Sequence, residues 1–397
     1  MHVRHPIWLA GVVRPGAAAF ALLFTLESVA RATLATVIPL QAYAAFQSSR
    51  AVSLLFTCVG AAGLTGSLSI PLLIRLVPRR FVYTLGGLGL MLAALLFALD
   101  GPAGLLAGML VRVLGVACLG IVLNLYIMDT IPRGELVRSE PLRLAVSGAA
   151  WTLCPSLGVF LYGRFGAPAA DALSAVAALV LLATFWALRL SDHPAIGPGR
   201  GPPPSPLRNV GRFLAQPRLR LGWLIAFGRS SWWSQFFTYA PLYMVISGRS
   251  ELAGAVLISL GNAAVLLTVL VGRLALRVGV RRVIVGAYLL TGATMLAVAL
   301  LVPTGASLVV AGLLLLGALW VSALDAVGNV PFLRAVRARE RAPMAAVFRT
   351  YTDLSDLLPS AVFAVLLSFF GLESVFAATG LSMLAIGIIA RRLPRAM

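Results

Sequence analysis

The chain has 397 residues, of which 60% are hydrophobic and 11% are charged, and its formal net charge is +19. Soluble domains contain about 25% charged residues, so this composition excludes an ordinary soluble globular protein. The excess positive charge would suit a nucleic-acid-binding protein, but the arginines lie in short loops between long apolar runs, and that arrangement is typical of a membrane protein.

About twelve apolar segments are long enough to cross a bilayer, whose hydrocarbon core takes about 20 helical residues. Turn residues, charges or both follow each segment. In chain order the segments are residues 17–40, 51–74, 81–99, 103–128, 140–162, 167–190, 220–246, 251–275, 281–302, 305–328, 344–369 and 372–390. The sequence therefore predicts an all-α polytopic membrane protein with twelve transmembrane helices.

The first segment carries two charged residues near its middle, Glu27 and Arg31. At about 1.5 Å per residue from Gly16, Glu27 lies about 16 Å into the bilayer, close to the midplane. A charge there costs roughly 2.5–3.5 kcal/mol on insertion scales, so such side chains normally face a protein interior or a water-filled cavity. The i, i+4 spacing places both residues on one helix face, where they can pair.

Arginine is distributed unevenly between the two sets of loops. The ends of the chain and every second loop are rich in arginine, whereas the alternate loops hold only Arg50, Arg164 and Arg249. The positive-inside rule therefore predicts that both termini and the long central loop are cytoplasmic. We expect the protein in the cytoplasmic (inner) membrane.

The central loop separates two groups of six segments. It contains GPGRGPPPSPLR, whose density of proline and glycine excludes a helix. A polyproline ligand is one interpretation, and a semi-rigid linker is the one that we favour. The predicted organisation is an N-terminal six-helix bundle at 1–190, a cytoplasmic linker at 191–218 and a C-terminal six-helix bundle at 219–397.

The two groups of segments repeat one another. At an offset of 202 residues, residues 70–80 align with residues 272–282 without a gap, and Pro39 aligns with Pro241. Repeated halves are typical of secondary transporters, in which the substrate site lies between the halves near the midplane. The repeat therefore predicts two pseudo-symmetric bundles.

The second copy of the repeat has a fixed pattern of glycine and arginine in a short loop: Gly272, Arg277, Gly279, Arg281 and Arg282. This pattern resembles the loop signature of the major facilitator superfamily, and the resemblance covers nearly the whole chain. It implies the fold of that family and transport by alternating access. The acid of the signature, which helps to latch the cytoplasmic gate in that family, is replaced here by Leu276, and by Ile74 in the first copy.

Charged residues near mid-depth are the candidates for proton coupling in a central cavity. The offset of 202 aligns Glu27 with Arg229, and we expect these two to face one another across the cavity. Arg31, Arg112 of the fourth segment and Asp356 of the eleventh complete the predicted site. Intramembrane charges are usually functional. The alternative is a permanent salt-bridge network that only holds helices together.

Aromatic residues follow Arg229 at helical spacing and could grip an aromatic or amphipathic substrate. The candidate substrate contacts are Trp232, Trp233 and Phe236. We expect Arg229 to lie over Trp233 in a cation–π contact, with aromatic packing as the alternative. Tyr239 and Tyr243 are expected in the aromatic belt at the outer interface.

Further carboxylates lie in the C-terminal half. Arg349, Asp353 and Asp356 are spaced i, i+4 and i+7 and share a helix face, and Asp325 lies closer to the cytoplasmic end. Such carboxylates can bind protons. A gate-side ion-pair network of Asp325, Arg349 and Asp353 is an equal alternative.

The fifth segment contains Cys154-Pro155-x-x-Gly158, which resembles the antiporter element G-P-x-x-G of the same family, with Cys154 in place of the first glycine. That element enforces close helix packing, and the resemblance favours export by proton exchange. Packing of small residues between helices is a sufficient alternative.

The chain has no lysine and hence no phosphate-binding P-loop, so we do not expect it to drive transport with ATP. We expect no enzyme activity, cofactor, metal or nucleic-acid partner, and a monomer in the bilayer that binds a small molecule and protons. The favoured function is proton-coupled export of an amphipathic compound. The alternatives are import or exchange of an organic anion, which the excess of arginine near mid-depth would suit, and a transport-inactive membrane scaffold.

Overall fold

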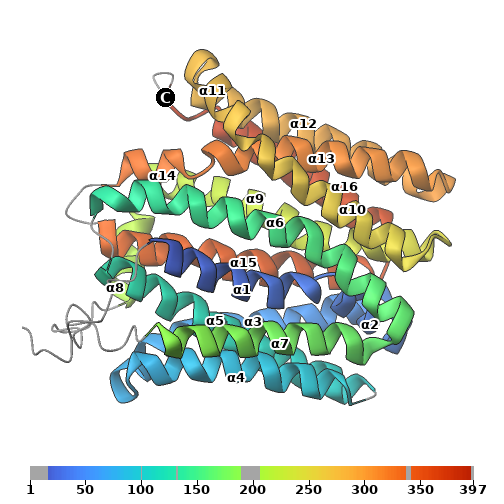
Figure 1. Cartoon of the computed structure of the whole chain (residues 1–397). Coiled ribbons are helices and arrows are strands. Elements are labelled where there is room, and N and C mark those ends of the chain that lie inside the picture. The colour runs from blue at the N-terminus through green and yellow to red at the C-terminus, as the bar shows by residue number, and fades with distance from the viewer. Residues whose placement is uncertain (1–16, 100, 131–132, 189–205, 337–340, 395–397) are drawn as a thin grey trace, which may run out of the picture.

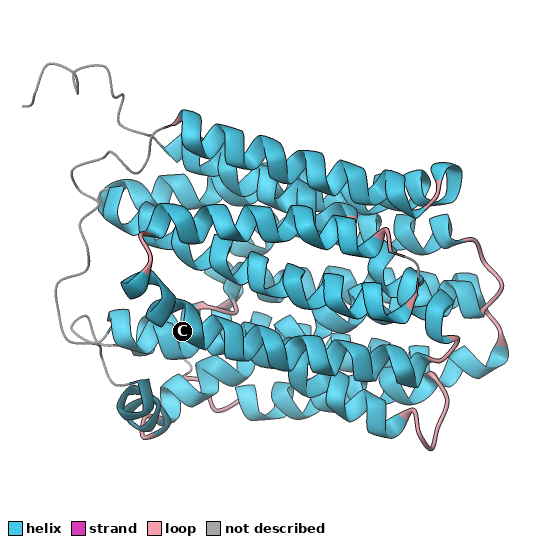
Figure 2. Ribbon diagram, turned by 90° about the horizontal axis from the view of Figure 1, so that it is seen from below, coloured by secondary structure: helices cyan, strands magenta, loops and turns pink. Residues whose placement is uncertain are grey.

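The computed structural model describes residues 17–99, 101–130, 133–188, 206–336 and 341–394. The predicted cytoplasmic ends at 1–16 and 395–397 and the linker residues 191–205 lie outside these ranges. All regular secondary structure in the described ranges is helical, and the long helices run side by side through the molecule (Figure 2).

Each of the twelve predicted segments falls on this helical framework. The first half of the chain forms α1 (Ala17–Thr33), α2 (Val37–Phe46), α3 (Ser49–Leu76), α4 (Arg79–Phe97), α5 (Pro102–Thr130), α6 (Arg133–Phe165) and α7 (Ala167–Ala187). The second half forms α8 (Pro206–Leu214), α9 (Pro217–Ile246), α10 (Glu251–Ala263), the 3-10 helix η3 (Ala264–Leu267), α11 (Thr268–Val278), α12 (Val280–Leu301), the 3-10 helix η4 (Val302–Thr304), α13 (Ser307–Val327), α14 (Val330–Ala335), α15 (Arg341–Leu366) and α16 (Glu373–Ala390).

The outer surface of the helices is apolar. Leu72, Leu95 and Leu300 are 62%, 68% and 77% exposed, and many other leucines resemble them. Within the described residues, eight helical segments are long and apolar enough to cross a membrane, and Glu251–Leu267 is a shorter apolar helix. Because lipid offers no hydrogen bonds to the backbone, spanning segments of this kind are helical. The prediction of an all-α polytopic membrane protein is confirmed.

The two halves of the chain lie next to one another. Figure 1 shows α4 and α7 at one edge of the molecule and α12 and α13 at the other. The halves meet where α3 packs on α15 and α6 packs on α10. We call the end with the α3–α4 and α11–α12 turns, which carry Arg79, Arg80, Arg281 and Arg282, the arginine-rich end, and the other the opposite end.

The sequence repeat is also a structural repeat. The Ser48 side chain accepts a hydrogen bond from the Ala51 N–H at the start of α3, and the Ser250 side chain accepts one from the Ala253 N–H at the start of α10. These serine caps stand 202 residues apart, the same offset that aligns the loops. Each satisfies a backbone donor that a helix start leaves without a partner.

The first spanning segment is interrupted between α1 and α2. Pro39 lacks an N–H and its ring crowds the carbonyl four residues earlier, so the helix is irregular there. The Ala35 N–H bonds to the Ala32 carbonyl instead, at 3.1 Å. At this place α6 packs so tightly on α1 that a Cβ on Gly158 would overlap the Thr33 carbonyl oxygen. The predicted close packing at Gly158 is confirmed.

The loop signature lies at the arginine-rich end. Gly272 and Arg277 belong to α11, and Arg281 and Arg282 belong to the first turn of α12. Gly279 between them has a φ of 97°, which side chains with a Cβ rarely adopt, so this turn requires glycine.

The prediction that residues 191–218 contain no helix is wrong for their second part. The helix α8 begins at Pro206, and proline is accepted at the first helical position because that N–H needs no partner within the helix. Phe213 of α8 is buried and stacks on Phe332 of α14, with ring centroids 6.4 Å apart. Tertiary packing against the second half therefore stabilises a helix that composition alone argues against.

Gly158→Ala is expected to lower the melting temperature of the purified protein. The added methyl group would overlap a backbone oxygen, and overpacking of this kind costs about 1–3 kcal/mol. Gly163→Ala on the same helix is the matched control, because no heavy atom lies within 4 Å of its new Cβ. Equal melting temperatures of the two variants would contradict the packing argument.

Candidate functional site

Glu27 and Arg31 form an ion pair on α1, as their spacing predicts. Arg31 Nη1 lies 3.2 Å from Glu27 Oε1. The Glu27 side chain is 1% exposed, whereas that of Arg31 is 32% exposed. The carboxylate therefore faces the protein interior, and the guanidinium reaches solvent-accessible space.

Two further residues of the first half contact Arg31. Arg112 of α5 donates from Nη2 to the backbone carbonyl of Arg31 at 2.9 Å. The Arg31 guanidinium carbon lies 5.7 Å from the ring centroid of Trp151 on α6. Among the described residues, no carboxylate lies within 4.0 Å of Arg112, so the first half holds a partly buried positive charge without an acidic partner.

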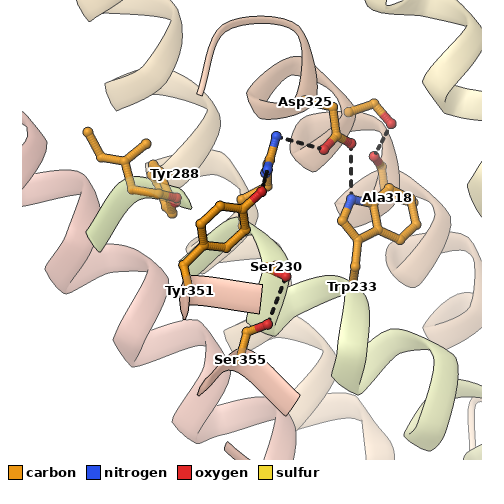
Figure 3. Close-up of polar contacts among 10 residues, drawn as sticks. Ser230, Trp233, Tyr288, Ala318, Asp325, Tyr351 and Ser355 are labelled. Atoms are coloured by element: carbon orange, nitrogen blue, oxygen red, sulfur yellow. Dashed lines mark hydrogen bonds and ion pairs between the residues drawn. The ribbon is translucent and has the colours of Figure 1, made fainter. Parts of the chain in front are cut away.

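A second ion pair lies in the other half, between Arg229 of α9 and Asp325 of α13. Arg229 Nη1 is 3.3 Å from Asp325 Oδ1, and Trp233 Nε1 donates to Asp325 Oδ2 at 3.0 Å. Arg229 Nη2 donates to the Tyr351 hydroxyl of α15 at 3.2 Å. The Arg229 guanidinium therefore bridges Asp325 and Tyr351, which are labelled in Figure 3. Both carboxylate oxygens of Asp325 and both terminal nitrogens of Arg229 are bonded.

Hydroxyl groups tie together the helices around this second pair. The Ser355 hydroxyl of α15 donates to the Ser230 hydroxyl of α9 at 2.7 Å, and the Tyr288 hydroxyl of α12 donates to the Ile225 carbonyl of α9 (Figure 3). Arg229 is therefore held in a well-bonded framework of α9, α12, α13 and α15, and its side chain is only 11% exposed.

Aromatic rings connect the two ion pairs across the interface between the halves. Trp151, which contacts Arg31, packs edge-on against Phe237 of α9 with ring centroids 5.3 Å apart. Phe237 lies 6.0 Å from Trp233, whose Nε1 binds Asp325. An unbroken series of contacts therefore runs from Glu27 in one half to Arg229 in the other.

Two predicted contacts differ from the observed ones. Glu27 and Arg229 do not form the expected pair across the halves, because each has an oppositely charged partner in its own half. The cation–π partner of Arg229 is Tyr351, with the guanidinium carbon 5.8 Å from the ring centroid, whereas Trp233 binds the carboxylate of Asp325. Asp325 and Tyr351, the observed partners of Arg229, are distant from it in sequence, and helix packing brings them close.

The charged residues of α15 are spread over the surface between the halves. Asp353 accepts a hydrogen bond from the Ser67 hydroxyl of α3 at 3.3 Å, and exposed Arg349 lies near Gly120 of α5. Asp325 is bonded to Arg229, so the predicted network of Asp325 with Arg349 is wrong.

Asp356 is exposed although it lies at mid-depth on α15. The groups near enough to affect its carboxylate come from both halves: Ser234 and Asp353 from the second and Arg31 from the first. Asp356 therefore lies where the two halves face one another.

Hydroxyl pairs join the halves nearer the opposite end. The hydroxyls of Ser53 on α3 and Tyr239 on α9 are 2.6 Å apart, and those of Ser156 on α6 and Ser259 on α10 are 2.7 Å apart. Tyr239 and Tyr243 are 1% and 2% exposed, so their predicted place in an aromatic belt is wrong. Tyr239 instead belongs to the contact surface between the halves.

The predicted substrate contacts fall into two groups. Trp232 and Phe236 are buried and stack on one another with centroids 4.9 Å apart, so they are packing residues in this conformation. Trp233 is partly exposed and faces Asp325.

Sequence reasoning missed Trp151, Tyr351 and Asp171. Trp151 stands three residues before the Cys154-Pro155 element, and Tyr351 shares α15 with three charged residues that were singled out. Asp171 could have been found from the sequence, because it is an acidic residue inside an apolar spanning segment.

A family of known proteins matches most of the chain. The model of the Major Facilitator Superfamily matches residues 20–358. The chain belongs to this superfamily. Membership, with the helical fold, identifies a membrane transporter rather than an enzyme.

Solved structures of transporters with the major facilitator fold overlay nearly the whole chain. A POT family transporter in complex with 5-aminolevulinic acid is 11% identical, with a TM-score of 0.78 and 95% of each chain covered. The peptide transporter POT in complex with sulfate is 16% identical, with a TM-score of 0.73, covering 95% of this chain and 94% of that one. The nucleoside transporter NupG (D323A mutant) is 13% identical, with a TM-score of 0.70 and coverages of 94% and 98%. These likenesses confirm the fold of two six-helix bundles.

The search of curated proteins found no match.

The Arg229–Asp325 pair yields a double-mutant prediction. Asp325→Asn and Arg229→Gln, made singly, each leave a partly buried charge without its partner, and such losses cost at most about 3–5 kcal/mol, the range for fully buried pairs. The double variant removes both charges and is expected to be more stable in thermal unfolding than the sum of the single losses implies. Additive losses would show that the two residues do not act as a pair.

Proposed function

We propose that this superfamily member couples proton movement to the export of a small amphipathic compound by alternating access. The observation that carries the proposal is the Glu27–Arg31 pair, in which a carboxylate with 1% exposure lies in the middle of a spanning segment beside a partly exposed arginine. Buried acids in such positions are typical of proton pathways. The resemblance of Cys154-Pro155-x-x-Gly158 to the antiporter element favours export.

Glu27 is the proposed proton carrier. Protonation removes its negative charge and with it the attraction that holds Arg31 on the same helix face. Arg31 contacts Trp151, and Trp151 contacts Phe237 of the other half, so release of Arg31 alters a contact between the halves. A proton thereby favours one arrangement of the halves over another, which is the requirement for coupling.

The substrate is proposed to bind between the halves, beside Trp151, Phe237 and Trp233. These rings offer an apolar surface, and exposed Asp356 and partly exposed Arg31 add charges near one another. An amphipathic molecule complements a surface of this kind, with its apolar part on the rings and its polar part toward the charges.

A second candidate function is import or exchange of an organic anion. Arg112 favours it, because the described residues place no carboxylate within 4.0 Å of this arginine. A substrate carboxylate could supply the missing negative charge. Inhibition of transport by small carboxylates, and its loss on Arg112→Gln, would favour this candidate over export of a neutral or cationic compound.

The arginine-rich end is proposed to face the cytoplasm, with both termini there and the protein in the inner membrane. The hydroxyl pairs Ser53–Tyr239 and Ser156–Ser259 then lie toward the outer face and close it in this conformation. On the cytoplasmic side, the Asp353–Ser67 hydrogen bond joins the halves. The acid of the loop signature is absent from that side.

Glu27→Gln is expected to abolish transport driven by a pH gradient in proteoliposomes, because the amide keeps the size of the side chain and carries no exchangeable acidic proton. The measurement is efflux of a fluorescent amphipathic dye with and without the gradient. Glu373→Gln, at the start of α16 away from the central charges, is the control and should retain transport. Full gradient-driven transport by Glu27→Gln would remove Glu27 from the mechanism.

Tyr239→Phe is expected to open the opposite end more often, because it removes the hydroxyl contact with Ser53. Loss of a hydrogen bond of about 0.5–1.5 kcal/mol shifts the equilibrium by about 2- to 12-fold. A membrane-impermeant thiol reagent should then react faster with a cysteine at Thr57, in a background without the native cysteines.

Tyr243→Phe, one turn later on α9, is the matched control. Its hydroxyl has no hydrogen-bond partner in the described chain, so this variant should leave the reaction rate unchanged. Equal rates in the two variants would show that the Ser53–Tyr239 contact does not hold that end closed.

A further inference from the structure

Asp171 in the second turn of α7 is an acidic residue that neither ion pair uses. It is 2% exposed, and Glu27 is the other acidic residue buried to this degree in the described part of the chain. Glu27 has Arg31 beside it. Neither carboxyl oxygen of Asp171 has a hydrogen-bond partner among the described residues.

The helices packed against α7 bring no positive charge to Asp171. On α1, the Ala30 carbonyl accepts a hydrogen bond from Ser174, one turn deeper than Asp171, at 2.7 Å, and Glu27 lies deeper still. Arg31 follows Ala30, but its guanidinium pairs with Glu27 at 3.2 Å and forms no ion pair with Asp171 among the described residues. On α4, residues 84–99 contain no titratable side chain.

On α6, Tyr162 is near enough to Asp171 to be affected by its charge, and Glu251 of α10 is also near Tyr162. Both groups are neutral or acidic and therefore do not favour an ionised Asp171. The arginines of this end, Arg50, Arg164 and Arg249, are exposed, and none forms an ion pair with Asp171.

An ionised carboxylate without a partner costs several kcal/mol in such a place, whereas a neutral carboxyl group costs far less. We propose that Asp171 holds a proton in this conformation and is a proton-binding site that exchanges with the solution when the opposite end of the molecule opens.

The position of Asp171 supports exchange at that end. Its neighbour Ala170 belongs to the same apolar cluster as Leu34 and Val37, which flank the interruption between α1 and α2. Thr36, within the interruption, also has a buried hydroxyl without a hydrogen-bond partner. The hydroxyl pairs between the halves keep the opposite end closed in this conformation. A change at the irregular backbone, when that end opens, would bring water or a new partner to Asp171.

A proton on Asp171 would extend the proposed proton coupling. The role of this proton in transport rests on the proposed function, whereas the protonated state of Asp171 does not. Asp171 adds a second protonatable site nearer the opposite end than Glu27. A proton bound there would stabilise the closed state of that end, and its release would require the end to open.

Infrared difference spectroscopy of the purified full-length protein tests the protonated state without any transport assay. At neutral pH, wild type is expected to show a carboxylic-acid carbonyl band that Asp171→Asn lacks and that the control Glu251→Gln retains. Asp171→Leu serves the same comparison if the amide variant does not fold. A band that remains in the Asp171 variants would overturn the inference.

Exchange of the Asp171 carboxyl proton for solvent deuterium shifts the same band, and its rate measures how readily solvent reaches the carboxyl group. Exchange is expected to be slow in wild type and several-fold faster in Tyr239→Phe, which weakens the closure of the opposite end. An equal exchange rate in the two proteins would overturn the proposed link to opening. Loss of gradient-driven transport in Glu27→Gln is a separate result, so failure of the coupling mechanism and failure of the Asp171 site are distinguishable.

Discussion

Charged groups in the interior of a bilayer need partners inside the protein, and in this transporter each ion pair is completed within one half. Glu27 is neutralised by Arg31 on its own helix, and Arg229 by Asp325 on another. Neither pair depends on the other half of the molecule. The halves can therefore move relative to one another without exposing a bare charge to lipid, which is a condition for alternating access in this fold.

The repeat gives the two halves equivalent helices, but the charged residues at equivalent positions differ. Glu27 and Arg229 occupy equivalent positions at an offset of 202, yet one is an acid and the other a base. In the second half, Arg229 is fixed by Asp325, Tyr351 and a framework of hydroxyl bonds. In the first half, the partner of Glu27 is partly exposed. We therefore propose that protonation occurs in the first half and that Arg229 and Asp325 serve as a structural anchor in the second.

Much of the fold could be predicted because it depends on local properties of the sequence. The length of the apolar runs fixes the spanning helices, and the i, i+4 spacing fixes the Glu27–Arg31 pair. The partner of Arg229 could not be predicted, since Asp325 approaches it only through the packing of α9 on α13. Symmetry suggested Glu27 instead and was misleading, because equivalent positions need not touch. Tyr239 looked like a belt residue from its depth alone, and α8 looked like part of a linker from its composition; tertiary contacts overrode both.

The central claim is that protonation inside the membrane changes how the halves sit at the opposite end. Spin labels on cysteines at Ala45 and Leu252, one exposed residue in each half at that end, would measure it in a protein whose native cysteines are replaced by alanine. The account predicts a distribution of distances that shifts between a short and a long population as the pH changes, and that loses this dependence in Glu27→Gln. A single distance that stays the same at every pH, in a protein that still transports, would contradict it.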